Sequence, residues 1–249
     1  MMQSIFGLVL LACLCQIPGP VQAEAPADDK TLILNTAVSE PLSNTSQTGF
    51  LDSLLGIALQ RLGYRLETVR IPAERALIVA NDGINDGEML RIGGLQKHYP
   101  NLIQVPEKIL DLEFVAFTRN ASLQINDWED LATLPVAVIT GWKIFEQNIP
   151  ASAELVSVKN ADQLFTLLVK NRTDVILYSR WSGLAYIRKH QLQNINIVEK
   201  SLAQESMYVY LHERHRKLVP LLASELRALK TDGEYQRLFT EILLPCTGG

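Results

Sequence analysis

The chain has 249 residues, of which 47% are hydrophobic and 20% charged, with a formal net charge of −4. These values are ordinary for a globular protein with one large domain or two smaller lobes. The acidic balance argues against a nucleic-acid-binding protein, which needs a basic face.

The first 23 residues have the pattern of an export signal. An apolar run over 5–15 is followed by Pro-Gly-Pro at 18–20 and by Val-Gln-Ala at 21–23, a small-x-small cleavage pattern. We therefore predict cleavage after residue 23 and a periplasmic location. The alternative is a lipobox at 10–13, in which Cys13 would be lipidated. No later stretch approaches the roughly 20 apolar residues of a membrane span.

Residues 31–115 are expected to form the first part of one lobe. A buried strand over 31–38 precedes a loop with Ser39 and Glu40, and an amphipathic helix over 50–62 leads to a strand over 64–71. A helix over 74–80, a turn at 81–83 and a strand from 86 to 90 follow. We expect the end of that strand to place Glu88 and Arg91 at the carboxyl edge of a parallel sheet, the usual ligand position in open α/β folds.

The same helix–turn–Asp–strand unit recurs over 161–178, which suggests a second, similar lobe over 116–204. Its predicted elements include a capped helical turn at 126–131, a strand over 135–140, a helix starting at 142, and a helix over 182–190. A strand over 110–118 is expected to enter this lobe and one over 206–211 to leave it. Residues 205–249 then complete the first lobe with two helices, and the double crossing predicts a hinge.

Three segments carry a resemblance to a known family: Gly49-Phe50-Leu51-Asp52 with Leu62-Gly63-Tyr64, Trp128-Glu129-Asp130-Leu131, and Lys230-Thr231-Asp232-Gly233-Glu234-Tyr235. In this order and spacing they resemble the extracellular solute-binding protein family 3, which serves polar amino acid transporters. The similarity covers about 31–244. It implies the type II periplasmic-binding-protein fold, with two α/β lobes joined by a two-strand hinge. It also implies a small polar solute as ligand, an ABC permease or a sensor as partner, and a monomeric state.

The ligand contacts of that family match this chain poorly. Members usually have an aromatic residue after the first strand, where this chain offers Ser39 and Glu40. Arg91 is a plausible substitute for the arginine that grips an α-carboxylate. The aspartate that holds the α-ammonium is replaced by Tyr178, and a buried cation without a partner is costly. Glu74 or Glu88 could replace that aspartate.

Candidate ligand contacts were therefore chosen from strand ends and helix starts. Glu88 and Arg91 are candidates in the first lobe, with an ion pair inside that lobe as the alternative. Glu74 and Arg75 start a helix, where a glutamate could simply favour the macrodipole.

In the second lobe the helix start at Trp142 and Lys143 suits a carboxylate. Tyr178, Arg180 and Trp181 suit a planar or carboxylate-bearing ligand. Packing of the two tryptophans and solvation of Arg180 are the alternatives.

The sequence predicts no metal or other cofactor. His212-Glu213-Arg214-His215 is expected to be a solvated loop, and phosphate-binding loops and nucleophile elbows are absent. With Cys13 and Cys15 in the signal, Cys246 is left without an internal disulfide partner. The leading hypothesis is a non-enzymatic binding protein that captures a carboxylate-bearing, amino-acid-like solute. The alternative is an enzyme resembling cyclohexadienyl or arogenate dehydratases, with Glu74 or Glu88 as general acid.

Overall fold

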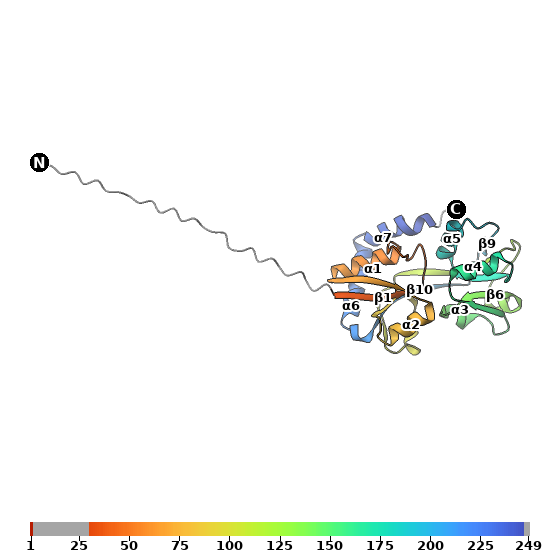
Figure 1. Cartoon of the computed structure of the whole chain (residues 1–249), viewed down its shortest axis with the longest axis horizontal. Helices are drawn as coiled ribbons and strands as arrows, with labels where there is room; N and C mark the ends of the chain where they lie inside the picture. Colours follow the sequence, from red (N-terminus) through yellow and green to blue (C-terminus); the bar gives the residue numbers. More distant parts are fainter. Residues whose placement is uncertain (2–29, 247–249) are drawn as a thin grey trace.

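The computed structural model describes residue 1 and residues 30–246 (Figure 1). The predicted signal, its cleavage site and Cys13 therefore lie outside the described residues. Within the described part of the chain, every helix is too short or too polar to cross a membrane.

A mixed sheet of ten strands runs through the molecule, with helices on both of its faces (Figure 1). One block consists of three parallel strands, β2 (Tyr64–Arg70), β1 (Lys30–Thr36) and β3 (Gly87–Ile92). A second parallel block contains β8 (Val175–Ser179), β6 (Pro135–Ile139) and β7 (Glu154–Val158). Each block is the centre of one α/β lobe.

Two long antiparallel strands join the lobes. The first part of β5 (Leu110–Thr118) pairs with the first part of β10 (Ala203–His212). The rest of β5 pairs with β8 and with β9 (Asn196–Ile197), whereas the rest of β10 pairs with β3 and β4 (Leu102–Gln104). The predicted α/β fold, with two lobes linked by two strands, is confirmed.

Helices cover the sheet in both lobes (Figure 1). In the first lobe these are α1 (Phe50–Arg61), α2 (Ala73–Asn81), α6 (Leu218–Thr231) and α7 (Glu234–Leu238), which continues as a π-helical turn over Phe239–Leu243. In the second lobe they are α3 (Lys143–Asn148), α4 (Ala161–Val169) and α5 (Arg180–Lys189). Helices α1, α2, α4 and α6 cover the sheet through buried apolar residues at helical spacing. Short 3-10 turns lie at Leu95–Lys97, Trp128–Thr133, Glu213–His215 and Leu244–Cys246.

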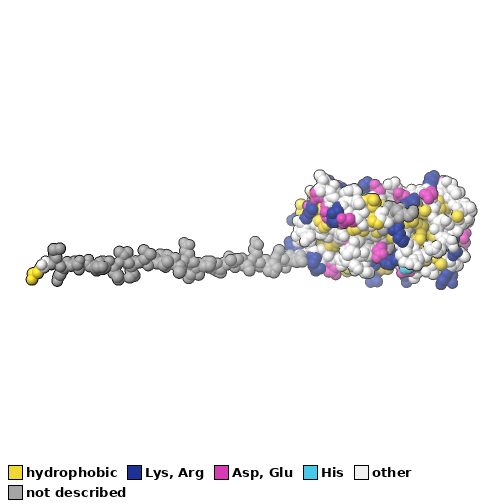
Figure 2. Space-filling view, turned by 90° about the horizontal axis from the view of Figure 1, so that it is seen from above, with side chains coloured by type: hydrophobic (Ala, Val, Ile, Leu, Met, Phe, Trp, Pro, Cys, Tyr) yellow, Lys and Arg dark blue, Asp and Glu magenta, His cyan; other side chains and the backbone are white. Residues whose placement is uncertain are grey.

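The main hydrophobic cluster includes residues of both lobes, because apolar packing continues through β5 and β10. A small second cluster under α2 contains Leu77, Ala80, Leu95, Tyr99, Leu102 and Tyr210. On the surface, acidic and basic side chains are interspersed on the face seen in Figure 2.

Two local predictions were wrong in a way that affects the site. Strand β3 extends to Ile92, because its pairing with β10 continues to Met207. Glu88 is therefore the second residue of the strand and does not lie at its end. Helix α5 begins at Arg180 and not at Ser182, so Arg180 and Trp181 belong to its first turn.

Candidate functional site

Two of the cavities that lie between the lobes share Ala37. The smaller, called the inner cavity here, has a volume of about 40 Å³. Its lining residues are Ala37, Val38, Leu90, Arg91, Ile92, Leu95, Leu112, Phe114, Gly141, Trp142, Lys143, Ile144 and Met207. The larger, called the outer pocket, has a volume of about 460 Å³. It is lined by Ala37, Ser39, Arg70, Ile71, Pro72, Ala73, Ile139, Lys159, Asn160, Ala161, Asp162 and Tyr178.

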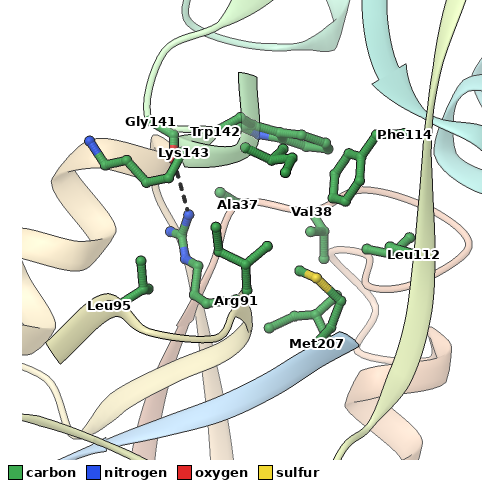
Figure 3. A pocket seen from close by; sticks show the side chains of 13 residues that line it. Ala37, Val38, Arg91, Leu95, Leu112, Phe114, Gly141, Trp142, Lys143 and Met207 are labelled. Carbon is green, nitrogen blue, oxygen red and sulfur yellow. Dashed lines mark hydrogen bonds between the residues drawn. The ribbon is translucent and has the colours of Figure 1, made fainter. Parts of the chain in front are cut away.

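The inner cavity is mainly apolar. Val38, Leu112, Phe114 and Met207 form one side of it, and the ring of Trp142 covers the top in Figure 3. Trp142 is 8% exposed and packs edge-on against Phe114, at 6.0 Å between ring centroids. Because about 40 Å³ is little more than the roughly 30 Å³ share of one liquid water, this cavity as it stands does not admit an amino acid.

Arg91 bridges the two lobes at the inner cavity. Its Nη2 donates to the carbonyl of Ala73 at 2.8 Å, and its Nη1 reaches the carbonyl of Gly141 in the second lobe at 3.5 Å (Figure 3). Its Nε donates to Glu88 Oε2 at 3.1 Å. The guanidinium is thus already paired with a carboxylate and two carbonyls.

Glu88 is fully buried behind Arg91 and lines neither cavity. Burial raises its pKa to about 7, although the charge and hydrogen bond of Arg91 act in the opposite direction. Within the described residues its Oε1 has no hydrogen-bond partner. The geometry is that of an ion pair inside the first lobe, the alternative considered for Glu88 and Arg91.

Lys143 forms a second bridge between the lobes. Its Nζ lies 2.6 Å from Glu74 Oε2 and 2.9 Å from Glu146 Oε2, and in Figure 3 its amine points away from Phe114 and Met207. Burial would raise the pKa of Glu74, but hydrogen bonds from Lys143 and Tyr99 outweigh it and lower that pKa. The amide of Gly141, just before α3, donates to Glu146 Oε1 at 2.6 Å. A carboxylate of the protein therefore already occupies this helix start.

Tyr178 connects the lobes through its hydroxyl group. The side chain is 1% exposed, and its oxygen lies 2.8 Å from Ser39 Oγ in the first lobe. Burial raises the pKa of Tyr178, so the phenol is neutral at physiological pH. Both residues line the outer pocket.

The remaining candidates lie away from both cavities. Glu40 pairs with Lys189 of α5 at 3.0 Å, a further contact between the lobes. Arg180 pairs with Glu113 of β5 at 2.7 Å, and Trp181 packs edge-on against Phe239 at 5.9 Å. Arg75 is exposed on α2. None of these four lines the inner cavity or the outer pocket.

Two cations of the outer pocket were missed in the sequence. Arg70 is the last residue of β2, and Lys159 directly follows β7. Both strands are parallel members of the sheet, so both residues lie at carboxyl ends, where ligands of open α/β folds bind. The same rule, applied to every predicted strand, would have found them.

The comparison with known proteins bears on the fold. No family model matches the sequence. An uncharacterized protein of Shewanella oneidensis is 28% identical over 188 residues, which cover 72% of this chain and 70% of that protein. The P235GK mutant of ArgBP from T. maritima has a TM-score of 0.72 at 18% identity, covering 85% of this chain and 94% of that one.

Two further solved structures are similar to this chain in fold. An amino acid ABC transporter substrate-binding protein from Streptococcus pneumoniae, bound to L-arginine, has a TM-score of 0.73 at 14% identity, covering 88% of this chain and 97% of that one. The chain has the type II periplasmic-binding-protein fold. The ancestral amino-acid-binding protein AncCDT-1, a precursor of cyclohexadienyl dehydratase, has the same fold, with a TM-score of 0.70 at 19% identity and coverage of 86% and 95%. These comparisons thus establish the fold in which the two cavities lie.

Proposed function

We propose that this protein captures a small carboxylate-bearing, amino-acid-like solute between its lobes. The observation that carries the proposal is the pair of cavities at the seam, whose walls come from both lobes and, for the inner cavity, also from the strands that join them. A solute held by both lobes binds the closed arrangement better than an open one, so capture and closure are linked. The L-arginine bound to the similar substrate-binding protein from Streptococcus pneumoniae supports an amino-acid-like solute.

The wider setting follows from the same proposal. Cleavage after residue 23 would release the protein into the periplasm, where it would act as a monomer. It would hand its solute to an inner-membrane ABC permease or report it to a sensor. The similarity to an ABC transporter substrate-binding protein supports the first of these partners.

Binding is favoured over catalysis by the state of the two carboxyl groups proposed as general acids. The pKa of Glu74 is lowered, and its carboxylate is held by Lys143 and Tyr99. Glu88 has a raised pKa but lines neither cavity. Neither group combines a protonated state at neutral pH with access to a substrate in these cavities.

Thermal unfolding with a panel of ligands tests the proposal. The panel contains the twenty amino acids, succinate and pyruvate, each added to the mature protein. A compound present at about a hundred times its Kd adds roughly 2.7 kcal/mol, which corresponds to about 5–10 °C in Tm for a protein of this size. We expect at least one compound to give such a shift and to be recovered unchanged. A panel without any shift, or consumption of prephenate or arogenate by the protein, would contradict the proposal.

A further inference from the structure

The cations at the cleft differ in whether a carboxyl group of the protein is already bonded to them. Arg91 pairs with Glu88, and Lys143 pairs with Glu74 and Glu146. Arg70 and Lys159 line the outer pocket, and neither makes an ion pair within the part of the chain that the structure describes. A solute anion is therefore attracted more strongly to the outer pocket than to the inner cavity.

The guanidinium of Arg70 makes two hydrogen bonds within the first lobe and has further N–H donors. Its Nη1 donates to the carbonyl of Val38, and its Nη2 donates to Ser43 Oγ at 3.2 Å. A guanidinium has five N–H donors, so these two bonds leave others for an acceptor in the pocket. The nearby carboxylate of Asp52 interacts electrostatically with Arg70 but does not form an ion pair with it. It is 4% exposed and is held by Ser43 and by the amide of Gly49.

Lys159 approaches the pocket from the second lobe. Its backbone amide donates to Gln163 Oε1 at 2.9 Å, which fixes the start of α4 beside it. Asp162 also lines the pocket, and its Oδ1 accepts a hydrogen bond from the hydroxyl of Tyr186 at 2.8 Å. The ionisable lining side chains apart from Tyr178 are thus two cations and one carboxylate, with a net charge of +1.

The hydroxyl pair of Ser39 and Tyr178 supplies a further donor. One of the two hydroxyl hydrogens is used in the bond between them, so the other is free to point elsewhere. Both residues line the outer pocket, so this pair adds hydroxyl groups to its polar surroundings. The pocket volume of about 460 Å³ lies within the usual 300–1,000 Å³ range of small-molecule sites.

We propose that the carboxylate of the captured solute binds in the outer pocket, bridging Arg70 of the first lobe and Lys159 of the second, and that the solute carries a net charge of −1. This inference rests on the function proposed above and specifies its substrate class. An anion that touches one cation from each lobe stabilises the closed arrangement through both contacts. A cationic amino acid such as L-arginine would raise the net charge of the occupied pocket from +1 to +2, so we expect it to bind less tightly than a solute of charge −1.

The test compares L-glutamate, L-glutamine, L-arginine, succinate and pyruvate at equal concentration. Binding is measured by calorimetry and by thermal shift on the wild type and on Lys159→Met, Arg70→Met and Lys200→Met. Lys200 is an exposed lysine outside both cavities and serves as the matched control. We expect an anionic probe to bind most tightly, with about tenfold weaker binding to Lys159→Met and no change for Lys200→Met.

Each other outcome is decisive. Arg70→Met also removes the hydrogen bonds of Arg70 to Val38 and Ser43. The decisive variant is therefore Lys159→Met, which loses no such hydrogen bond. Unchanged affinity of an anionic probe for Lys159→Met would overturn the assignment of the anion site, while the proposed capture function would stand. Tighter binding of L-arginine or L-glutamine than of every anionic probe would overturn the inferred charge. Binding of none of the probes would overturn the assignment, and only an empty result from the full panel above would reject capture itself.

Discussion

Glu88 is a buried acid whose ionisation falls near neutral pH. It lies under the cleft, beside Arg91, and burial raises its pKa from 4.5 to about 7. A raised pKa means that the protonated acid is the form that folding favours. The stability linked to this group is therefore complete below pH 4.5 and is lost as the pH rises through about 7.

Glu88→Gln isolates this contribution at the scale of one residue. The amide of the variant keeps the shape of the carboxyl group and does not ionise. The free energy of unfolding of the variant therefore does not fall at high pH through burial of a carboxylate at position 88. The wild type, relative to the variant, should lose about 3 kcal/mol between pH 4.5 and pH 8, from about 2.5 pKa units at 1.36 kcal/mol each. Denaturant unfolding of both proteins across this range measures the difference. A difference that stays constant with pH would contradict the prediction.

Gly141 determines how closely the start of α3 approaches α2. Its φ is +86°, and a Cβ built on it would lie 2.3 Å from the backbone nitrogen of Glu74 in the other lobe. The closed arrangement of the two elements thus depends on a backbone position without a side chain. Gly94 has a similar φ of +83° but open space around its Cβ position, which makes it a matched control.

Gly141→Ala should therefore cost more than Gly94→Ala. Both substitutions carry a strain of about 1 kcal/mol from the left-handed backbone. Gly141→Ala adds overpacking between α3 and α2, which costs roughly a further 1–3 kcal/mol or is relieved by separation of the lobes. Urea unfolding and small-angle scattering of both variants measure the two results. Equal stability and equal radius of gyration for the two variants would refute this account of the α2–α3 contact.

At the scale of the whole molecule, polar contacts between side chains hold the lobes together. Ser39 meets Tyr178, Glu74 meets Lys143, and Glu40 meets Lys189. The connecting strands β5 and β10 allow rotation at their junction, whereas these contacts oppose it. Their loss should shift the population toward more open forms.

Tyr178→Phe tests the buried member of this set. The substitution removes the hydroxyl bond to Ser39 and should cost about 1 kcal/mol while raising the radius of gyration. Tyr186→Phe is the control, because its hydroxyl bonds Asp162 within the same lobe at 2.8 Å. Only the first variant should change the scattering profile. The same profile for both variants would mean that the Ser39–Tyr178 bond does not hold the lobes closed.

The order of elements could be predicted because it depends on local patterns. The apolar spacing of 50–62 produced α1, and the aliphatic run at 110–118 corresponds to β5. The short strand β4 at Leu102–Gln104 was missed, since three residues carry no clear periodicity and β4 exists only through its pairing with β10. The repeated helix–turn–strand unit was sufficient to indicate two similar lobes.

The sequence by itself determined the two α/β lobes, their two connecting strands and the set of polar residues near strand ends, because alternation, helical spacing and glycine turns act over a few neighbouring positions. Which of those residues line the cavities between the lobes was decided by tertiary structure alone. Glu74 meets Lys143 across 69 positions and Ser39 meets Tyr178 across 139 positions. Charge neutralisation depends on such distant neighbours, so Arg91 and Lys143 are already paired, whereas Arg70 and Lys159 line the outer pocket without an ion pair to any described residue.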